Sequence, residues 1–288
     1  MVHEDRVLRA ITDDGAFRVI AADTTATVRE AVAAQKIESA ELVRIFAELL
    51  TGAVLVRESM APDYRLQAIL QGDDPRVRMV ADTHPDGATR GLIQSPPNTR
   101  AMALGERGLL QIARTLHNGA LHQGVVQVPQ KTPTISAAYM AYMQESEQVV
   151  TVVAVGAHLA GGGEVVAAGG YMVQLLPEVA EGPLMVMTER LKNFEDIVPL
   201  LARGAATPET LLAETLYGMP YTKVGDRAVH FGCRCSPERL AGSLASLPRA
   251  DIESLMEGGK TLEIECDYCR KHYEFTIDQL KHLLEPAN

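Results

Sequence analysis

The four cysteines constrain this chain more than any other feature, because they occur as two short pairs near one end. The pairs are Cys233–Arg–Cys235 and Cys266–Asp–Tyr–Cys269. Two pairs of soft ligands at this spacing match the four-thiolate tetrahedron that Zn²⁺ prefers, whereas four unrelated buried thiols would not be expected to occur as pairs. The sequence therefore predicts a zinc site whose ligands are Cys233, Cys235, Cys266 and Cys269.

A closed site of four cysteines is usually structural, since it leaves no coordination position for water or substrate. Other catalytic signatures are missing from the sequence: the eight histidines form no HExxH pair, and no GxSxG motif occurs. His272 follows Cys269 by three residues, but we do not expect it to be a ligand. Gly258–Gly–Lys–Thr261 resembles the end of a phosphate-binding loop, yet Ser254 stands where the first glycine is required. We therefore predict no catalytic residues and no enzymatic activity.

The charge of the chain argues against a nucleic-acid partner. The formal net charge is −10, from 27 basic and 37 acidic residues, and the region from Phe231 onward has 7 Lys and Arg against 10 Asp and Glu, or −3. A zinc module that binds nucleic acid neutralises phosphates with lysine and arginine. The cysteine-bearing region has the opposite sign.

The sequence also argues against export and membrane insertion. Its apolar runs are far shorter than the ~20 residues that a membrane span needs. The N-terminal residues Met1–Val–His–Glu–Asp–Arg6 are polar and acidic, unlike a secretory signal. We expect a cytoplasmic protein with no membrane partner, where thiols stay reduced and paired cysteines act as metal ligands or redox sensors.

Residues 1–177 are predicted to form an α+β domain. Asp13–Asp14–Gly15 is typical of a hairpin turn, and Ser39 is a candidate N-cap. The number of strands favours one sheet covered by helices on one side. Apolar periodicity predicts helices at 24–35, 39–54 and 135–146, and strands at 6–12, 16–22, 65–71, 77–82, 88–94, 109–116, 120–128, 149–158 and 164–176.

Residues 178–232 are predicted to be a helical, marginally stable linker, with amphipathic helices over 178–203 and 208–216. Residues 233–288 are predicted to be a small zinc-binding domain. Ser236 would cap one helix, strands 261–265 and 272–276 would form a hairpin, and Thr276 would cap a last helix over 277–284. The apolar stripes of the linker contain Leu184, Leu191, Leu200, Leu201, Leu211, Leu212 and Leu216.

The segments 231–239 and 266–275, at this separation, resemble the carboxy-terminal signature of the 33 kDa chaperonin family, redox-regulated holdases of the cytoplasm. Segments 70–75, 142–148 and 168–177 resemble that family's amino-terminal motifs in the same order. The resemblance thus covers nearly the whole chain. It implies an ATP-independent heat-shock chaperone that is inactive while reduced and zinc-bound.

The resemblance further implies how such a chaperone would be activated. Oxidation would join Cys233 to Cys235 and Cys266 to Cys269, eject zinc, unfold the linker and expose apolar surface. The partners would be unfolded or aggregation-prone client proteins, and the oxidised, active form would be a homodimer.

A physical argument from the residues supports a switch of this kind. A module of fewer than 60 residues buries too little apolar surface to be stable alone, so zinc would supply on the order of 10 kcal/mol. The same thiolates that bind zinc are the targets of oxidants. A CxC disulfide closes a very small ring, so it should be strained and comparatively easy to reduce again.

Two other functions remain open from the residues alone. A constitutive zinc-ribbon adaptor in transcription or translation would bind its partner regardless of oxidants, but the acidic module disfavours it. A zinc enzyme would need an open coordination position, which four cysteines do not leave.

Overall fold

The computed structural model describes residues 4–116, 118–177, 179–204, 207–256, 261–282 and 284. The chain divides into two compact units, residues 1–232 and 233–288. The predicted α+β class is confirmed. Among the described residues, no helix is long and apolar enough to cross a membrane.

In the described part of the larger unit there are two mostly antiparallel sheets, with helices between them and on one side. The first sheet has the strand order β10-β1-β2-β9-β8, and the second has the order β11-β5-β4-β3-β6-β7, in which β11 pairs with β5 in parallel. The strands are β1 (Arg6–Thr12), β2 (Phe17–Asp23), β3 (Arg65–Gln71), β4 (Arg78–Thr83), β5 (Ala88–Gln94), β6 (Leu109–Thr115), β7 (Leu121–Gln127), β8 (Thr151–Leu159), β9 (Val165–Leu175), β10 (Tyr221–Ala228) and β11 (His230–Phe231).

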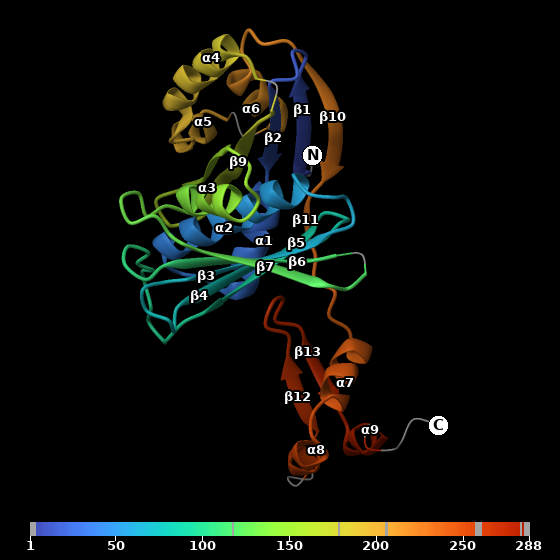
Figure 1. Ribbon diagram of the computed structural model, residues 1–288. Coiled ribbons are helices and arrows are strands. Elements are labelled where there is room, and N and C mark those ends of the chain that lie inside the picture. Colours follow the sequence, from blue (N-terminus) through green and yellow to red (C-terminus); the bar gives the residue numbers. More distant parts are fainter. Residues whose placement is uncertain are drawn as a thin grey trace. The chain divides into compact units, whose positions relative to one another are not determined.

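The helices of this unit form two layers. The helices α1, α2 and α3 lie between the two sheets, while α4, α5 and α6 cover the other face of the first sheet (Figure 1). The helical elements are α1 (Thr25–Gln35), α2 (Ala40–Glu58), α3 (Ile135–Glu145), α4 (Glu181–Leu191), the 3₁₀ turn η1 (Lys192–Phe194), α5 (Val198–Ala202) and α6 (Pro208–Thr215).

The expectation of a single sheet was wrong. Strand β3 of the second sheet alternates between buried and half-buried residues, but β9 of the first sheet is buried at nearly every position because helices cover both faces of its sheet. Alternation of apolar and polar residues in the sequence indicates which faces of a strand are buried. Strand pairing, in contrast, depends on contacts between segments that are distant in the sequence. The pattern therefore predicted most of the strands without assigning them to two sheets.

Helix α2 lies at the centre of the larger unit. The Ser39 hydroxyl accepts from the backbone N–H of Leu42, as the predicted N-cap requires. Residues of α2 are buried on all sides of the helix, because both sheets and α3 pack against it. At Gly52 there is no room for a side chain, since a Cβ would lie 2.0 Å from the ring of Tyr139.

Gly52→Ala is expected to lower the free energy of unfolding by about 1–3 kcal/mol through overpacking, although alanine favours a helix by about 1 kcal/mol. The Tyr139 ring cannot move aside easily, because it is fully buried and its hydroxyl donates to the Leu49 carbonyl at 2.7 Å. Urea unfolding followed by circular dichroism measures the change. Gly182→Ala in α4 is the matched control, because its Cβ would meet no atom within 4 Å, and this variant should be at least as stable as the parent. Equal stability of the two variants would contradict the packing argument.

The segment predicted as a helical linker contains both helices and strands. Its first predicted helix is interrupted between α4 and α5, where Pro199 occupies the first turn of α5. After Thr215 the chain forms strands β10 and β11, which we did not predict. Strand β10 is a mostly exposed edge strand with little apolar alternation, and its pairing with β1 defines it. This segment is therefore part of both sheets of the larger unit.

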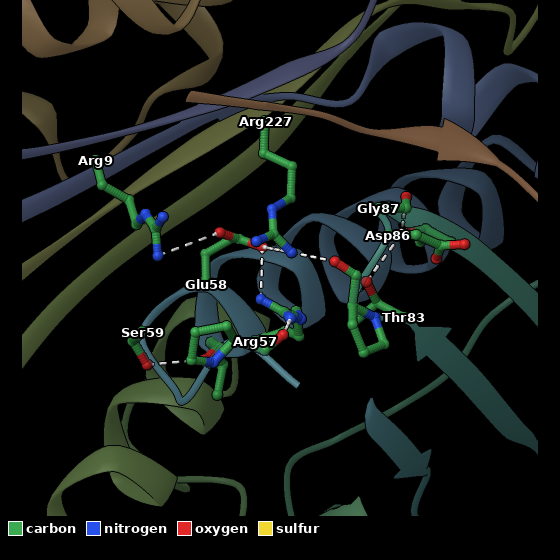
Figure 2. A network of polar contacts seen from close by, with 12 residues as sticks. Arg9, Arg57, Glu58, Ser59, Thr83, Asp86, Gly87 and Arg227 are labelled. Atoms are coloured by element: carbon green, nitrogen blue, oxygen red, sulfur yellow. Dashed lines mark hydrogen bonds and ion pairs between the residues drawn. The ribbon is translucent and has the colours of Figure 1, made fainter. Parts of the chain in front are cut away.

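Three arginines surround one buried glutamate at the end of α2 (Figure 2). Glu58 is 4 % exposed, and its carboxylate lies 2.8 Å from Arg57, 3.8 Å from Arg9 on β1 and 3.9 Å from Arg227 on β10. Arg57 also donates to the Pro62 carbonyl. The glutamate thus links α2 to the edge strand β10, which precedes the cysteine-bearing unit in the sequence.

The smaller unit contains three helices and one hairpin among its described residues. Ser236 accepts from the backbone N–H of Arg239 and caps the first helix as predicted. Helix α8 was not predicted. The elements are α7 (Pro237–Ala245), α8 (Arg249–Met256), β12 (Leu262–Glu265), β13 (His272–Phe275) and α9 (Ile277–His282).

Candidate metal centre

Two local structures position the four cysteines. Cys233 and Cys235 lie in an extended segment immediately before α7, and Cys266 and Cys269 lie in the turn between β12 and β13. The turn is closed by the backbone N–H of Arg270, which donates to the Cys266 carbonyl at 2.8 Å. Arg270 has a positive φ of 58°, which lets the chain reverse direction within a few residues.

The four sulfurs converge on one point. All four Sγ atoms lie within 4.8 Å of one another, and the Sγ–Sγ distances are 3.7 Å for Cys233 and Cys266 and 3.3 Å for Cys235 and Cys269. A zinc tetrahedron with Zn–S bonds of roughly 2.3 Å has sulfurs about 3.8 Å apart, whereas a disulfide bond is about 2.05 Å. All four cysteines are free thiols, and the donor set fits Zn²⁺.

Hydrogen bonds distinguish the sulfurs. Burial raises the pKa of Cys235, but the Tyr273 hydroxyl and the neighbouring sulfurs outweigh it and lower that pKa to about 7. The Tyr273 hydroxyl lies 3.0 Å from the Cys235 sulfur. Burial raises the pKa of Cys266 and of Cys269, and the hydrogen bond to Cys235 raises the pKa of Tyr273. A bound cation of charge +2 would favour the thiolate form of all four cysteines.

The apolar core beside the sulfurs is small. Its buried members are Leu244, Cys266, Tyr273, Phe275 and Leu280. Small cysteine-rich modules with a core of this size usually obtain much of their stability from a bound metal.

The four predicted ligands are brought together, and His272 is not among them. The His272 side chain is 73 % exposed and lies 3.2 Å from a Glu265 carboxylate oxygen. Sequence reasoning missed Tyr273, although the alternation in β13 places it on the inner face with Phe275. The glycine-rich segment resembling a phosphate-binding loop lies mostly outside the described residues, since 257–260 are not described.

The fold and the cysteine centre define a protein with a two-sheet α+β unit and a small carboxy-terminal module that contains a cluster of four cysteines. The sequence profile of the family described as Hsp33 protein matches residues 5–276. The chain belongs to the Hsp33 family, and the resemblance inferred from the cysteine signature is confirmed.

Relatives of this family match the chain from end to end. The 33 kDa chaperonin of Geobacter sulfurreducens is 31 % identical, over 97 % of this chain and 94 % of the relative. That of Syntrophotalea carbinolica is 29 % identical, over 98 % and 99 %. The crystal structure of the 33 kDa chaperonin of Thermotoga maritima shares the fold with a TM-score of 0.81 at 22 % identity, over 98 % of both chains. The family and these names support a heat-shock chaperone.

Proposed function

We propose that this protein is a redox-regulated, ATP-independent holdase of the cytoplasm. While reduced, it would hold zinc through Cys233, Cys235, Cys266 and Cys269 and be inactive. When oxidised, it would bind unfolding client proteins as a homodimer and prevent their aggregation, acting as a binder rather than an enzyme. The observation that carries the proposal is the convergence of four free sulfurs in a unit with a small apolar core.

Oxidation of the cysteines would remove the metal ligands. Each pair of thiolates loses two electrons to the oxidant and forms one S–S bond, and hydrogen peroxide takes up these electrons with two protons from the solvent to give two molecules of water. The pairs joined would be Cys233 with Cys235 and Cys266 with Cys269. A disulfide no longer offers two thiolates, so zinc would be released and the smaller unit would lose most of its stability.

The surface that would bind clients is an apolar face covered by the segment before the cysteines. The outer face of the first sheet presents apolar side chains, including Leu8, Phe17 and Tyr171, and α4, α5 and α6 bury them. Uncovering this face would expose a large apolar surface, of the kind that binds unfolded chains. The helices contribute Met187, Leu191, Ile197, Leu201, Leu211, Leu212 and Leu216.

Helix α4 is the loosely packed part of this cover. Its N-cap residue Ala180 offers no side-chain hydrogen bond, and its buried residues are Met187 and Leu191 alone. Met185 is 66 % exposed, and a cavity of ≈ 960 Å³ separates the helix from α3 and the first sheet, with Leu184 in its lining. Few buried contacts imply a low cost of local opening. This supports the proposal that the segment before the cysteines is a metastable linker. The segment continues through β10 and β11, and β11 ends at Phe231, shortly before the first cysteine of the smaller unit.

The proposal predicts that the oxidised protein suppresses aggregation of a thermally unfolding test protein and the reduced, zinc-loaded protein does not. Light scattering measures aggregation, while a chelating dye measures released zinc and a thiol reagent counts free cysteines. Re-reduction with zinc present should abolish the activity. Equal suppression by both forms would exclude a redox switch, and unchanged hydrogen-exchange protection of the described residues between 179 and 231 after oxidation would exclude the linker's part in it.

A further inference from the structure

The two cysteine pairs receive hydrogen bonds from different kinds of donor. In the CxxC pair, backbone groups of Tyr268 and Cys269 donate to the Cys266 sulfur. In the CxC pair, the Cys235 sulfur lies 3.0 Å from the side-chain hydroxyl of Tyr273. The donor to Cys235 belongs to a side chain, so it can be removed without altering the backbone.

The Tyr273 ring is held in place independently of this hydrogen bond. It is 6 % exposed in the small apolar core and lies opposite Ile264 in the β12–β13 hairpin. The Lys271 ammonium is 5.4 Å from the ring centroid. The same hydroxyl is 3.2 Å from the Cys235 carbonyl oxygen. The hairpin therefore places the hydroxyl beside both the sulfur and the backbone of Cys235.

We propose that Tyr273 is a positioning residue of the cysteine centre, whose hydroxyl orients Cys235 and lowers the reactivity of its sulfur toward oxidants. The inference rests on the proposed function and names a residue that regulates the same site. A hydroxyl that donates to a thiolate withdraws electron density from the sulfur. Hydrogen-bond donors of this kind around a metal site orient the ligands and adjust how strongly each ligand donates electrons to the metal. Tyr273 would thus favour the metal-binding form of the centre and slow its oxidation.

The oxidation step shows where the hydroxyl acts. The Cys235 thiolate attacks one oxygen of hydrogen peroxide, the O–O bond breaks, and hydroxide leaves, so that a sulfenic acid forms. The thiol of a second cysteine then attacks this sulfur, the S–S bond forms, and the sulfenic hydroxyl leaves with the thiol proton as water. The first step uses a lone pair of the Cys235 sulfur, and a hydrogen bond from Tyr273 makes the electrons of that sulfur less available. At a pH where Cys235 is a thiolate with or without this hydrogen bond, removing the donor should therefore accelerate the step.

Tyr273→Phe tests the proposal in the full-length protein, since it removes the hydroxyl and keeps the ring. With Co²⁺ as a spectroscopic probe, the sulfur-to-cobalt charge-transfer band is expected to move to lower energy, because the sulfur becomes a better electron donor. With Zn²⁺, competition with a chelator should show about 10-fold weaker binding. At a pH where Cys235 is a thiolate in both proteins, differential alkylation followed by mass spectrometry should show faster oxidation of Cys235 by hydrogen peroxide in the variant.

Phe275→Leu is the matched control. Phe275 is 4 % exposed in the same core, and this variant loses ring packing but retains the Tyr273 hydroxyl. It should destabilise the unit without moving the charge-transfer band. The proposal is wrong if Tyr273→Phe has the parent's band, zinc affinity and oxidation rate, or if Phe275→Leu moves the band as far as Tyr273→Phe does.

These measurements do not depend on client binding, so the two proposals can fail separately. If the Tyr273→Phe variant has the parent's charge-transfer band, zinc affinity and oxidation rate, and its oxidised form still suppresses aggregation, only the role of Tyr273 would be overturned. A variant that shows all three expected changes would support that role even if the oxidised parent protein did not bind clients, a result that would overturn the proposed function.

Discussion

Cys233→Ser is expected to weaken zinc binding by the chain and to destabilise the folded structure of its smaller unit. Structural zinc sites contribute about 10–16 kcal/mol, or about 3 kcal/mol for each of four sulfurs, which corresponds to roughly 100-fold weaker binding. The remaining apolar core is too small to compensate. Competition with a chelator measures the affinity, and hydrogen exchange across the described residues from 235 to 282 measures the structure.

The same variant is expected to suppress client aggregation without added oxidant, because loss of the metal and oxidation of the ligands would have the same structural result. Glu263→Ser is the matched control, since Glu263 is exposed on β12 of the same hairpin and all four sulfurs remain. It should bind zinc as the parent does and stay inactive while reduced. A Cys233→Ser variant with normal zinc affinity and a protected smaller unit would contradict the assignment of Cys233 as a ligand.

Glu58→Gln is expected to lower the free energy of unfolding of the larger unit by about 3–5 kcal/mol, because removing one partner of a buried ion pair leaves an uncompensated charge. Arg57 is 1 % exposed, so water cannot replace the lost carboxylate. Arg9 and Arg227 would face Arg57 with no negative charge between them (Figure 2). Urea unfolding followed by circular dichroism measures the loss, since the chain has no tryptophan to serve as a fluorescent probe.

A second effect of Glu58→Gln should appear in β10. Because Arg227 belongs to β10, the amide groups of that edge strand should exchange faster than those of β2, which lies inside the same sheet. Glu189→Gln is the matched control, since its ion pair with Lys192 is exposed to solvent and should contribute little to stability. If Glu58→Gln and Glu189→Gln lowered the free energy of unfolding by similar amounts, burial would not be what makes the Glu58 cluster stabilising.

The local features of the fold could be predicted because their causes lie within a few residues. The Ser39 and Ser236 caps bond to N–H groups three residues away, and the hairpin around the turn at Gly15 follows from a local backbone preference. The convergence of the four cysteines was predictable for a similar reason, since each pair places two sulfurs close together in the sequence. The CxC and CxxC pairs, at the distance along the chain that separates them, were also enough to indicate the family.

Features that depend on distant residues could not be predicted. Strand β10 has few apolar residues, and it is a strand because β1, more than 200 residues earlier, offers a free edge. The Glu58 cluster joins residues from α2, β1 and β10, so no local pattern indicates it. Tyr273 was predicted to lie in a strand, but its proximity to Cys235 arises only when the hairpin packs against the segment before α7.

By itself, the sequence determined the pairing of the cysteines in the carboxy-terminal centre, the α+β class and most of the helices and strands, because thiol spacing, capping and apolar periodicity act over one or two turns of chain. Only the tertiary structure decided that the strands form two sheets, that α4, α5 and α6 cover an apolar face, and that a tyrosine hydroxyl contacts one ligand sulfur. These are contacts between segments far apart in sequence, and their free energy depends on burial and charge pairing that exist only once the chain has folded.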